Sequence, residues 1–228
     1  MSTKEATRTP AVEDYTKAIF SLESRRDEPV STKTLAERLE ITPGSVSAML
    51  KRLDELGLIV HVPYRGVRLT EAGRRIALEV IRHHRLLESY LAEVLGMPWD
   101  RVHDEAEVLE HVLSDDLEEL IAAKLGHPTV DPHGDPIPTA AFDLYEGETR
   151  GLDELPIGAT GCFVRVSDSD PEMLRYLAAQ GIAIGDELEV VDRQPFGGPL
   201  YVRFGESTHA LGDALTRAMR VELGEASL

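Results

Sequence analysis

Histidine and carboxylate side chains recur at helical spacing in one segment of the chain. His103, Glu107, Glu110 and His111 stand at i, i+4, i+7 and i+8, which places all four on one face of a predicted helix. Apolar residues occupy the other faces, so this stripe is not simply the solvated side of an amphipathic helix. Imidazole nitrogens and carboxylate oxygens together are typical ligands of divalent transition metals.

A second pair of the same kind precedes this segment. His84 and Glu88 are four residues apart on the preceding predicted helix, and the short connection allows the two helices to pack antiparallel. Surface helices often carry such pairs without function, but two coordinated pairs favour a site. Because gathered carboxylates repel one another unless a cation offsets their charge, we expect a bound metal ion.

The same residues also suggest a hydrolytic metal site, because a divalent ion held by His and Glu can activate water. The spacing argues against it. The segment Glu107-x-x-Glu110-His111 lacks the first histidine of the His-x-x-Glu-His pattern, and no His-Glu-x-x-His occurs. We therefore predict no catalytic residues and no enzyme.

The N-terminal part has the pattern of a winged helix-turn-helix. Helices are predicted from Pro10 to about Arg26, from 31 to 39 and from 45 to 56, and β-rich runs at 58–62 and 67–69 form a hairpin wing. The first turn of a reading helix needs small side chains that reach base edges, and basic residues nearby contact phosphates. The candidate DNA contacts are Thr42, Pro43, Ser45, Ser47, Ala48, Lys51, Arg52, Arg65 and Arg68.

The rest of the chain predicts a mainly α protein with a small β part. Helices are expected at 71–95, 99–113 and 115–125, followed by a proline-rich extended linker over 127–150. Short β-like runs at 161–166, 187–192 and 200–204 surround a helix at 171–180 and suggest an SH3-like barrel. The expected domains are 1–75 for DNA binding, 76–150 for metal binding and dimerisation, and 151–228 for the barrel.

Charge is unevenly distributed. Residues 1–75 hold 13 Lys and Arg against 11 Asp and Glu, whereas the remainder holds 11 against 30, within a total of −17. Residues 1–75 are therefore suited to binding a polyanion, and the acidic remainder of the chain is suited to binding cations. Because Cys162 is the single cysteine, the chain cannot form an internal disulfide. No apolar run is long enough to cross a membrane, and the polar N-terminal segment lacks the apolar stretch of a signal peptide. We expect a cytoplasmic protein with no membrane partner.

These features together resemble the diphtheria-toxin-repressor family of metal-dependent regulators. The resemblance rests on the winged helix-turn-helix, on HDEAEVLEHVLSD at 103–115, on RHHRLLE at 82–88, on PHGDPIP at 132–138 and on the C-terminal FeoA-like barrel. It implies a homodimer that binds a double-stranded DNA operator and represses metal-uptake genes when metal is plentiful.

The resemblance also implies a primary metal site. Its ligands would be Asp14, His84, Glu107, Glu110 and His111. Iron-responsive relatives have methionine at the position of Asp14 and cysteine at that of Glu107, whereas manganese-responsive relatives have oxygen ligands at both. Hard carboxylates suit Mn²⁺, although Fe²⁺, Co²⁺ and Zn²⁺ also accept these ligands. We therefore expect manganese, with an iron-responsive repressor or a winged-helix sensor of an organic ligand as alternatives.

A departure from the pattern concerns Lys17. Short manganese regulators of the family have a carboxylate there, so their two-manganese arrangement is not expected in this chain. Longer relatives build a second site from the helical domain, the linker and the barrel. The corresponding residues, with His103 as a further ligand, are Glu88, His103, Asp131, His133 and Asp168. Asp14 would connect the DNA-binding domain to the metal.

Overall fold

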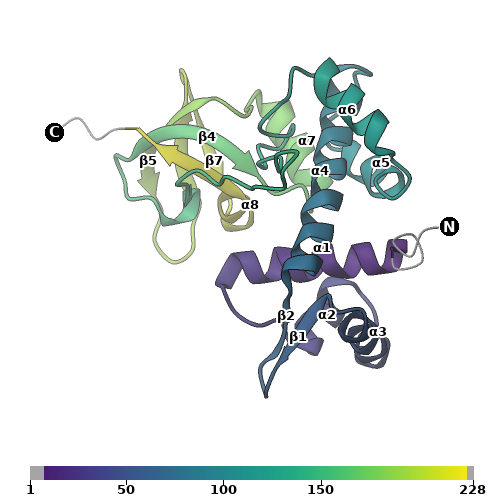
Figure 1. The fold of residues 1–228 in the computed structure, drawn as a ribbon. Helices are drawn as coiled ribbons and strands as arrows, with labels where there is room; N and C mark the ends of the chain where they lie inside the picture. Colours follow the sequence, from purple (N-terminus) through teal and green to yellow (C-terminus); the bar gives the residue numbers. More distant parts are fainter. Residues whose placement is uncertain (1–7, 225–228) are drawn as a thin grey trace. The chain divides into compact units, whose positions relative to one another are not determined.

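The computed structural model describes residues 8–224, which divide into two compact units (Figure 1). Within the described range, the first unit runs to His84 and also includes Leu109–Ser114 and Pro138–Leu144. The second unit comprises Arg85–Val108, Asp115–Ile137 and the chain from Tyr145 onward. The long helix α4 (Glu71–Glu93) therefore contributes its first part to one unit and its last part to the other.

The first unit contains the expected winged helix-turn-helix. Its helices are α1 (Pro10–Arg26), α2 (Thr32–Arg38) and α3 (Pro43–Glu55), followed by the antiparallel strands β1 (Ile59–Val62) and β2 (Gly66–Leu69). Their apolar stripes share one core, which includes Val12, Ile19, Leu35, Leu53 and Val67. The wing is the β1–β2 hairpin.

Side-chain caps set the helix starts in this unit. The Thr9 hydroxyl accepts a hydrogen bond from the backbone N–H of Val12, and Pro10 follows at the first helical position. The predicted start of the reading helix at residue 45 is wrong, because α3 begins at Pro43. Thr42 caps it by accepting from the Ser45 N–H, so Pro43 opens the helix instead of breaking it.

A glycine fixes the wing against the start of α2. Gly66 has φ +128°, and a Cβ there would lie 2.1 Å from the carbonyl oxygen of Val30. Next to it, the Val30 N–H donates to the Val67 carbonyl at 2.8 Å, and the Val67 N–H returns the bond at 3.0 Å. Only glycine permits this close approach, which ties β2 to the helix-turn-helix.

The helix that carries the metal-ligand motif is shorter than predicted. The expected helix at 99–113 begins at Val102 and ends at Leu109 as α5, and α6 (Asp115–Lys124) follows. Glu110 and His111 therefore lie in the turn beyond α5, and the predicted single face with His103 and Glu107 is wrong. The Glu110 carbonyl oxygen lies 3.1 Å from Nδ1 of His83, which replaces a helical partner for that carbonyl.

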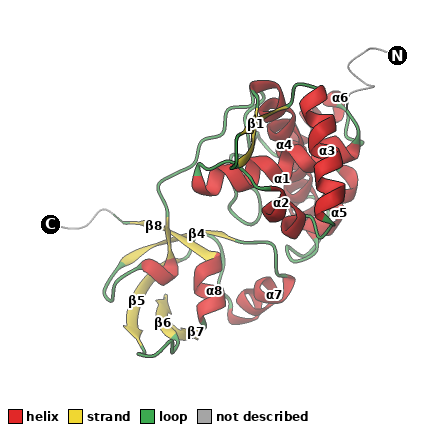
Figure 2. Ribbon diagram, turned by 90° about the horizontal axis from the view of Figure 1, so that it is seen from below, coloured by secondary structure: helices red, strands yellow, loops and turns green. Residues whose placement is uncertain are grey.

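The second unit ends in a barrel-like sheet, drawn in yellow in Figure 2. Its strand order is β3-β8-β4-β5-β6-β7, and every pairing is antiparallel. The elements are β3 (Arg150–Gly151), the 3₁₀ turn η1 (Leu152–Glu154), β4 (Thr160–Val166), α7 (Pro171–Gln180), β5 (Glu187–Arg193), β6 (Leu200–Phe204), β7 (Ser207–Leu211), α8 (Asp213–Ala218) and β8 (Met219–Leu223).

The three predicted strands of the barrel, β4, β5 and β6, and the predicted helix α7 are confirmed. The sequence prediction missed β3, β7, α8 and β8. The side chains of Phe163, Leu177, Val190, Val202 and Val221 are buried together in its core. Strand β7 has few apolar residues, so its pattern is weak in isolation. Strand β8 alternates Met219, Val221 and Leu223 with polar residues, a strand pattern that the sequence prediction missed. No helix in the described part of the chain is long and apolar enough to cross a membrane.

Candidate metal centres and DNA interface

Three predicted primary ligands converge in the first unit. Asp14 lies on α1, and Glu110 and His111 lie on the turn after α5. The Nε2 atom of His111 is 3.0 Å from Oδ1 of Asp14 and 3.7 Å from Oε1 of Glu110. Their potential ligand atoms all lie within 4.8 Å of one another. Two carboxylates and one imidazole at this separation are a suitable donor set for a divalent cation.

Glu13 orients the histidine of this cluster. Its Oε2 lies 2.6 Å from Nδ1 of His111, and because a carboxylate can only accept, that nitrogen carries a proton. The lone pair of neutral His111 then lies on Nε2, beside Asp14. Arg8 holds Glu13 in turn, at 2.9 Å, and also donates to Glu79 at 2.6 Å. Carboxylate support of this kind is common behind metal-bound histidines.

Glu110 is the most deeply buried carboxylate of the cluster, with a side chain 0% exposed. Its Oε2 lies 2.6 Å from Nδ1 of His84, the fourth predicted primary ligand within this unit. Lys17, on α1, donates to both carboxylate oxygens, at 2.8 and 3.0 Å. Sequence reasoning identified Lys17 only as a departure from the family pattern, and missed both this ion pair and the role of Glu13.

A second cluster forms within the second unit. The Nδ1 atom of His103 lies 3.3 Å from Glu88 Oε1 and 3.0 Å from Asp168 Oδ2. Hydrogen bonds to Asp168 and then to Glu88 raise the pKa of His103 to about 10. Burial acts to raise the pKa of Asp168, but the hydrogen bond and charge of His103 outweigh it and lower that pKa. The predicted ligands from α4, α5 and the barrel are thus brought together.

The linker adds His133 to this cluster. Its ring is 0% exposed, and Nε2 donates to the backbone carbonyl of Trp99 at 2.8 Å, so the lone pair of the neutral ring lies on Nδ1. Nδ1 is buried with no hydrogen-bond partner among the described residues, 3.9 Å from Oε1 of Glu88. A buried nitrogen lone pair beside carboxylates fits a metal ligand.

Asp131 completes the linker turn. Its Oδ1 accepts from the N–H groups of His133 and Asp135 at 2.8 and 2.9 Å, which shapes the turn. Burial, followed by the negative charge of Glu88, raises its pKa well above the ordinary value. The positive charge of Arg85, whose Nε lies 3.7 Å from Oδ2 of Asp131, acts in the opposite direction and lowers that pKa. The donor set of Glu88, Asp131 and His133, whose ligand atoms lie within 4.8 Å of one another, fits a cation.

Glu107 belongs to the second unit. It lies on α5, where its Oε1 is 3.8 Å from Nε2 of His103. No cysteine belongs to any of the clusters that the described residues form.

The predicted DNA-reading residues line the start of α3. Thr42, Pro43, Ser45, Ser47 and Ala48 are all exposed, as are Lys51 and Arg52 one turn later. Two hydroxyls also serve the helix itself, because Thr42 caps it and Ser47 donates to the Pro43 carbonyl at 2.9 Å. The exposed surface of α3 therefore combines short polar side chains with two cations.

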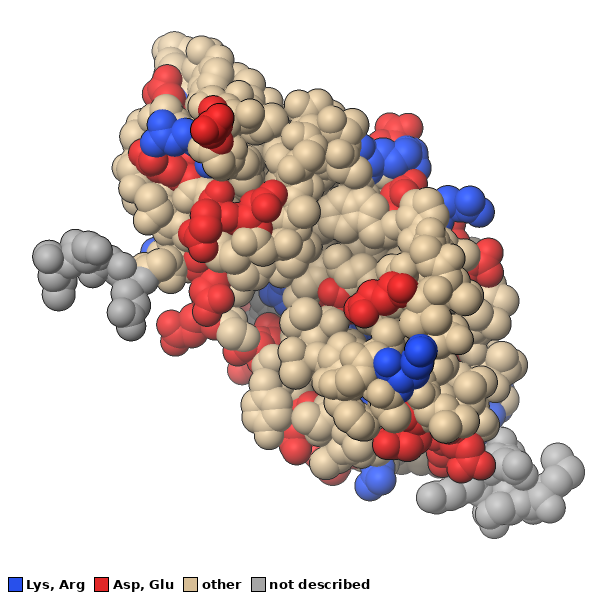
Figure 3. All heavy atoms as spheres, turned by 90° about the horizontal axis from the view of Figure 1, so that it is seen from above, with Lys and Arg blue, Asp and Glu red and all other residues tan. Residues whose placement is uncertain are grey.

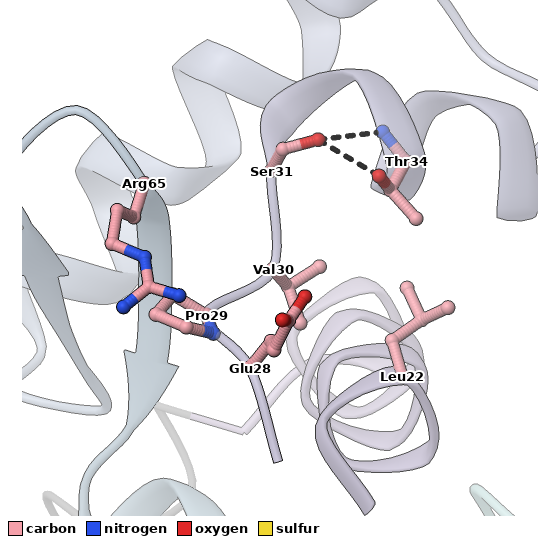
Figure 4. Close-up of a pocket in the computed structure, with 7 residues that line it drawn as sticks. All are labelled: Leu22, Glu28, Pro29, Val30, Ser31, Thr34 and Arg65. Atoms are coloured by element: carbon pink, nitrogen blue, oxygen red, sulfur yellow. Dashed lines mark hydrogen bonds between the residues drawn. The ribbon is translucent and has the colours of Figure 1, made fainter. Parts of the chain in front are cut away.

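The two wing arginines differ. Arg68 donates to the side chain and backbone of Asp27, at 3.1 and 2.6 Å, so it fastens β2 to the end of α1. Arg65 is exposed, and Figure 4 shows its side chain extending toward Pro29. It borders a pocket whose other lining residues are Leu22, Glu28, Pro29, Val30, Ser31 and Thr34. At the tip of the wing, Tyr64 is fully exposed in the left-handed region, and sequence reasoning missed it.

Acidic side chains outnumber basic ones on the face shown in Figure 3. On the face shown in Figure 3, Asp and Glu gather in groups, whereas Lys and Arg are scattered. Phosphate binding requires positive potential, so this face does not suit DNA.

Family models match nearly the whole chain. Residues 8–67 match the iron-dependent repressor N-terminal DNA-binding domain, 70–139 the iron-dependent repressor metal-binding and dimerisation domain, and 150–223 the FeoA domain. The iron-dependent repressor IdeR of Mycobacterium tuberculosis is 33% identical over 223 residues, covering 92% of this chain and 96% of the relative. The chain belongs to the diphtheria-toxin-repressor family.

Two further members of the diphtheria-toxin-repressor family are informative. The diphtheria toxin repressor of Corynebacterium diphtheriae is 32% identical over 232 residues, covering 92% of this chain and 96% of that protein. The solved structure of a manganese-dependent transcriptional repressor in complex with manganese is 43% identical, with a TM-score of 0.87, and covers 93% of this chain and 100% of that one. This protein is thus a metal-dependent transcriptional repressor and not an enzyme, and the organic-ligand alternative is wrong.

Proposed function

We propose that this repressor responds to manganese. The observation that carries the proposal is the donor set of the first cluster, in which Asp14, Glu110 and His111 offer oxygen and nitrogen without sulfur. Hard oxygen donors suit Mn²⁺, whereas thiolate and thioether ligands favour softer ions. The relatives differ in the metal that their names give. The curated relative at 33% identity is named an iron-dependent repressor, and the solved structure at 43% identity is named a manganese-dependent repressor. The higher identity supports manganese.

The primary ion would be held by Asp14, Glu110 and His111, with His84 and Glu107 as the further ligands that the family resemblance implies. Glu13 supports this assignment because it occupies Nδ1 of His111 and leaves Nε2 for the ion. A bound divalent ion would supply positive charge between carboxylates that otherwise repel one another.

The second ion would be held within the second unit by Glu88, His103, Asp131, His133 and Asp168. The buried Nδ1 of His133 and the raised pKa of Asp131 support a cation there. Trp99 supports the assignment because its carbonyl fixes the tautomer of His133.

Control of DNA binding follows from the position of Asp14. It lies on α1, whose buried face packs in the same core as α3, while Glu110 and His111 come from a separate segment of the chain. An ion held by all three therefore fixes α1, and with it the DNA-reading helix. In a dimer, two fixed reading helices can match successive major grooves, about 34 Å apart.

Exposed apolar side chains support a homodimer. On α6, Leu117 and Leu120 are 48% and 67% exposed, and Val108 on α5 is 70% exposed. This region falls in the part that matches the metal-binding and dimerisation model. Apolar residues in such number at the surface of a helical domain are typical of an interface.

Manganese is expected to control operator affinity in the wild-type protein. Gel-shift titrations of a duplex carrying the operator should show at least about tenfold tighter binding in Mn²⁺ than in chelator, since typical coupling between two ligands is 1–3 kcal/mol. An unrelated duplex of equal length controls for non-specific binding. Equal affinity in Mn²⁺ and chelator would contradict the proposed function.

Asp14→Met should shift the metal preference toward iron. A thioether replaces a hard oxygen, so we expect Mn²⁺ affinity to fall by about tenfold or more relative to Fe²⁺ affinity. Anaerobic titrations with each metal measure the ratio of the two dissociation constants. Glu28→Met, which changes an exposed carboxylate near the end of α1, is the matched control and should leave the ratio unchanged. An unaltered ratio in Asp14→Met would remove Asp14 from the selectivity argument.

A further inference from the structure

Lys17 places an ammonium group among the proposed primary ligands. Its Nζ atom lies 2.8 and 3.0 Å from the two carboxylate oxygens of Glu110 and 3.2 Å from Nδ1 of His84. The Lys17 side chain is 20% exposed, whereas that of Glu110 is fully buried. A single positive group is therefore in contact with both carboxylate oxygens that a divalent ion would need, and it lies beside the ring of His84, whose Nδ1 faces Glu110.

Two cations cannot share this position. Like charges about 3 Å apart repel strongly in a poorly solvated site, where the effective dielectric constant is far below that of water. A lysine can leave, because its charge is carried on a flexible four-carbon stem and its side chain reaches solvent. Glu110 cannot move out into solvent in the same way, because its side chain is fully buried. Binding of an ion by Glu110 and His84 thus requires the Lys17 ammonium to withdraw.

We propose that Lys17 is a tethered counter-ion that competes with the divalent metal for Glu110 and His84 and thereby sets the metal concentration at which the repressor responds. This inference rests on the proposed function. Lys17 and Asp14 are three residues apart on the same helix, so α1 has two anchoring groups one turn apart. At low metal, Lys17 anchors α1 to Glu110. At high metal, Asp14 anchors it through the ion.

The alternative role for Lys17 is a supporting one, in which its hydrogen bonds orient Glu110 for the metal. The two roles predict opposite effects on affinity. Removal of a competitor strengthens metal binding, whereas removal of a supporting group weakens it, typically by about 10–100-fold.

The test is calorimetric titration of Mn²⁺ into the full-length wild-type, Lys17→Met and Lys17→Gln proteins. We expect Mn²⁺ affinity to rise at least about tenfold in Lys17→Met, as loss of one charge-assisted hydrogen-bonded competitor implies. Lys17→Gln should also bind more tightly and serves if the methionine variant does not fold. Lys33→Met removes the same charge from an exposed position, 84% exposed, and should alter affinity less than about twofold.

Thermal unfolding gives a second readout. In chelator, Lys17→Met should melt below wild type, because Glu110 loses its buried counter-ion, and the rise in Tm on adding Mn²⁺ should be larger than in wild type. Unchanged or weaker Mn²⁺ binding in both Lys17 variants, with wild type still binding, would overturn the Lys17 proposal and leave the proposed function intact. Absence of Mn²⁺ binding in wild type and variants alike would overturn both.

Discussion

Glu110→Gln is expected to abolish manganese-dependent operator binding. The substitution keeps the size of the side chain but removes the charge from the carboxylate that lies between His84, His111 and Lys17. A neutral amide is a poor ligand for Mn²⁺, and even residues behind a metal ligand are worth about 10–100-fold in affinity. Operator affinity in Mn²⁺ should therefore fall by the whole manganese response of the wild-type protein, at least about tenfold, to the level of the wild-type protein in chelator.

Glu105→Gln provides the matched control for this prediction. It makes the same chemical change five residues earlier, on an exposed position of α5. Operator affinity should be measured by fluorescence anisotropy in Mn²⁺ and in chelator, and circular dichroism should establish that both variants are folded. A Glu110→Gln protein that keeps the manganese response of Glu105→Gln would show that the first cluster is not the regulatory site.

Local signals explain why the DNA-binding part could be predicted from sequence. The caps at Thr9 and Thr42 act within three residues, and the apolar stripes of α1 and α3 repeat with the helical period. The start of α3 was misplaced because Pro43 and Gly44 are read as breakers, although proline is favoured at the first helical position.

The candidate site was only partly predictable, because its geometry depends on long-range pairs. The spacing of His103, Glu107, Glu110 and His111 fits a helix, yet α5 ends at Leu109. Contacts of Glu110 with His84, and of its carbonyl with His83, form only once segments 26 or 27 residues apart have packed. Residue spacing alone does not show such tertiary contacts. The family resemblance placed His84 and Glu110 in one site, but nothing in the sequence indicated the pairing of Glu13 with His111, 98 residues apart.

In the proposed mechanism, metal binding and operator binding by the first unit are thermodynamically coupled. If metal binding strengthens operator binding by a given factor, DNA strengthens metal binding by the same factor. Lys17 enters this balance on the opposite side, because it stabilises Glu110 when metal is scarce. A repressor with such a competitor responds at a higher metal concentration than its ligand set alone would give.

Gly134→Ala is expected to disrupt the proposed second metal site, formed by Glu88, His103, Asp131, His133 and Asp168, by displacing the linker from the barrel. Gly134 has φ +84°, and a Cβ there would lie 1.9 Å from the carbonyl oxygen of Val164 and 2.9 Å from Cα of Arg165. The neighbouring His133 carbonyl accepts from the Val166 N–H at 2.9 Å, so the clash forces His133 away from Glu88. We expect a loss of about 2 kcal/mol or more in stability of the second unit.

Trp99 can report this displacement, because it is the single tryptophan and its ring stacks on His133 at 6.1 Å between centroids. Mn²⁺ is paramagnetic and should quench Trp99 fluorescence when held by His133, and Gly134→Ala should lose that quenching. Gly158→Ala is the control, because Gly158 has the same φ of +84° with no atom within 4 Å of the added Cβ. It carries the backbone strain without the clash, so it should be less destabilised and keep the quenching. Equal behaviour of the two variants would mean that backbone strain alone, and not contact between linker and barrel, governs this position.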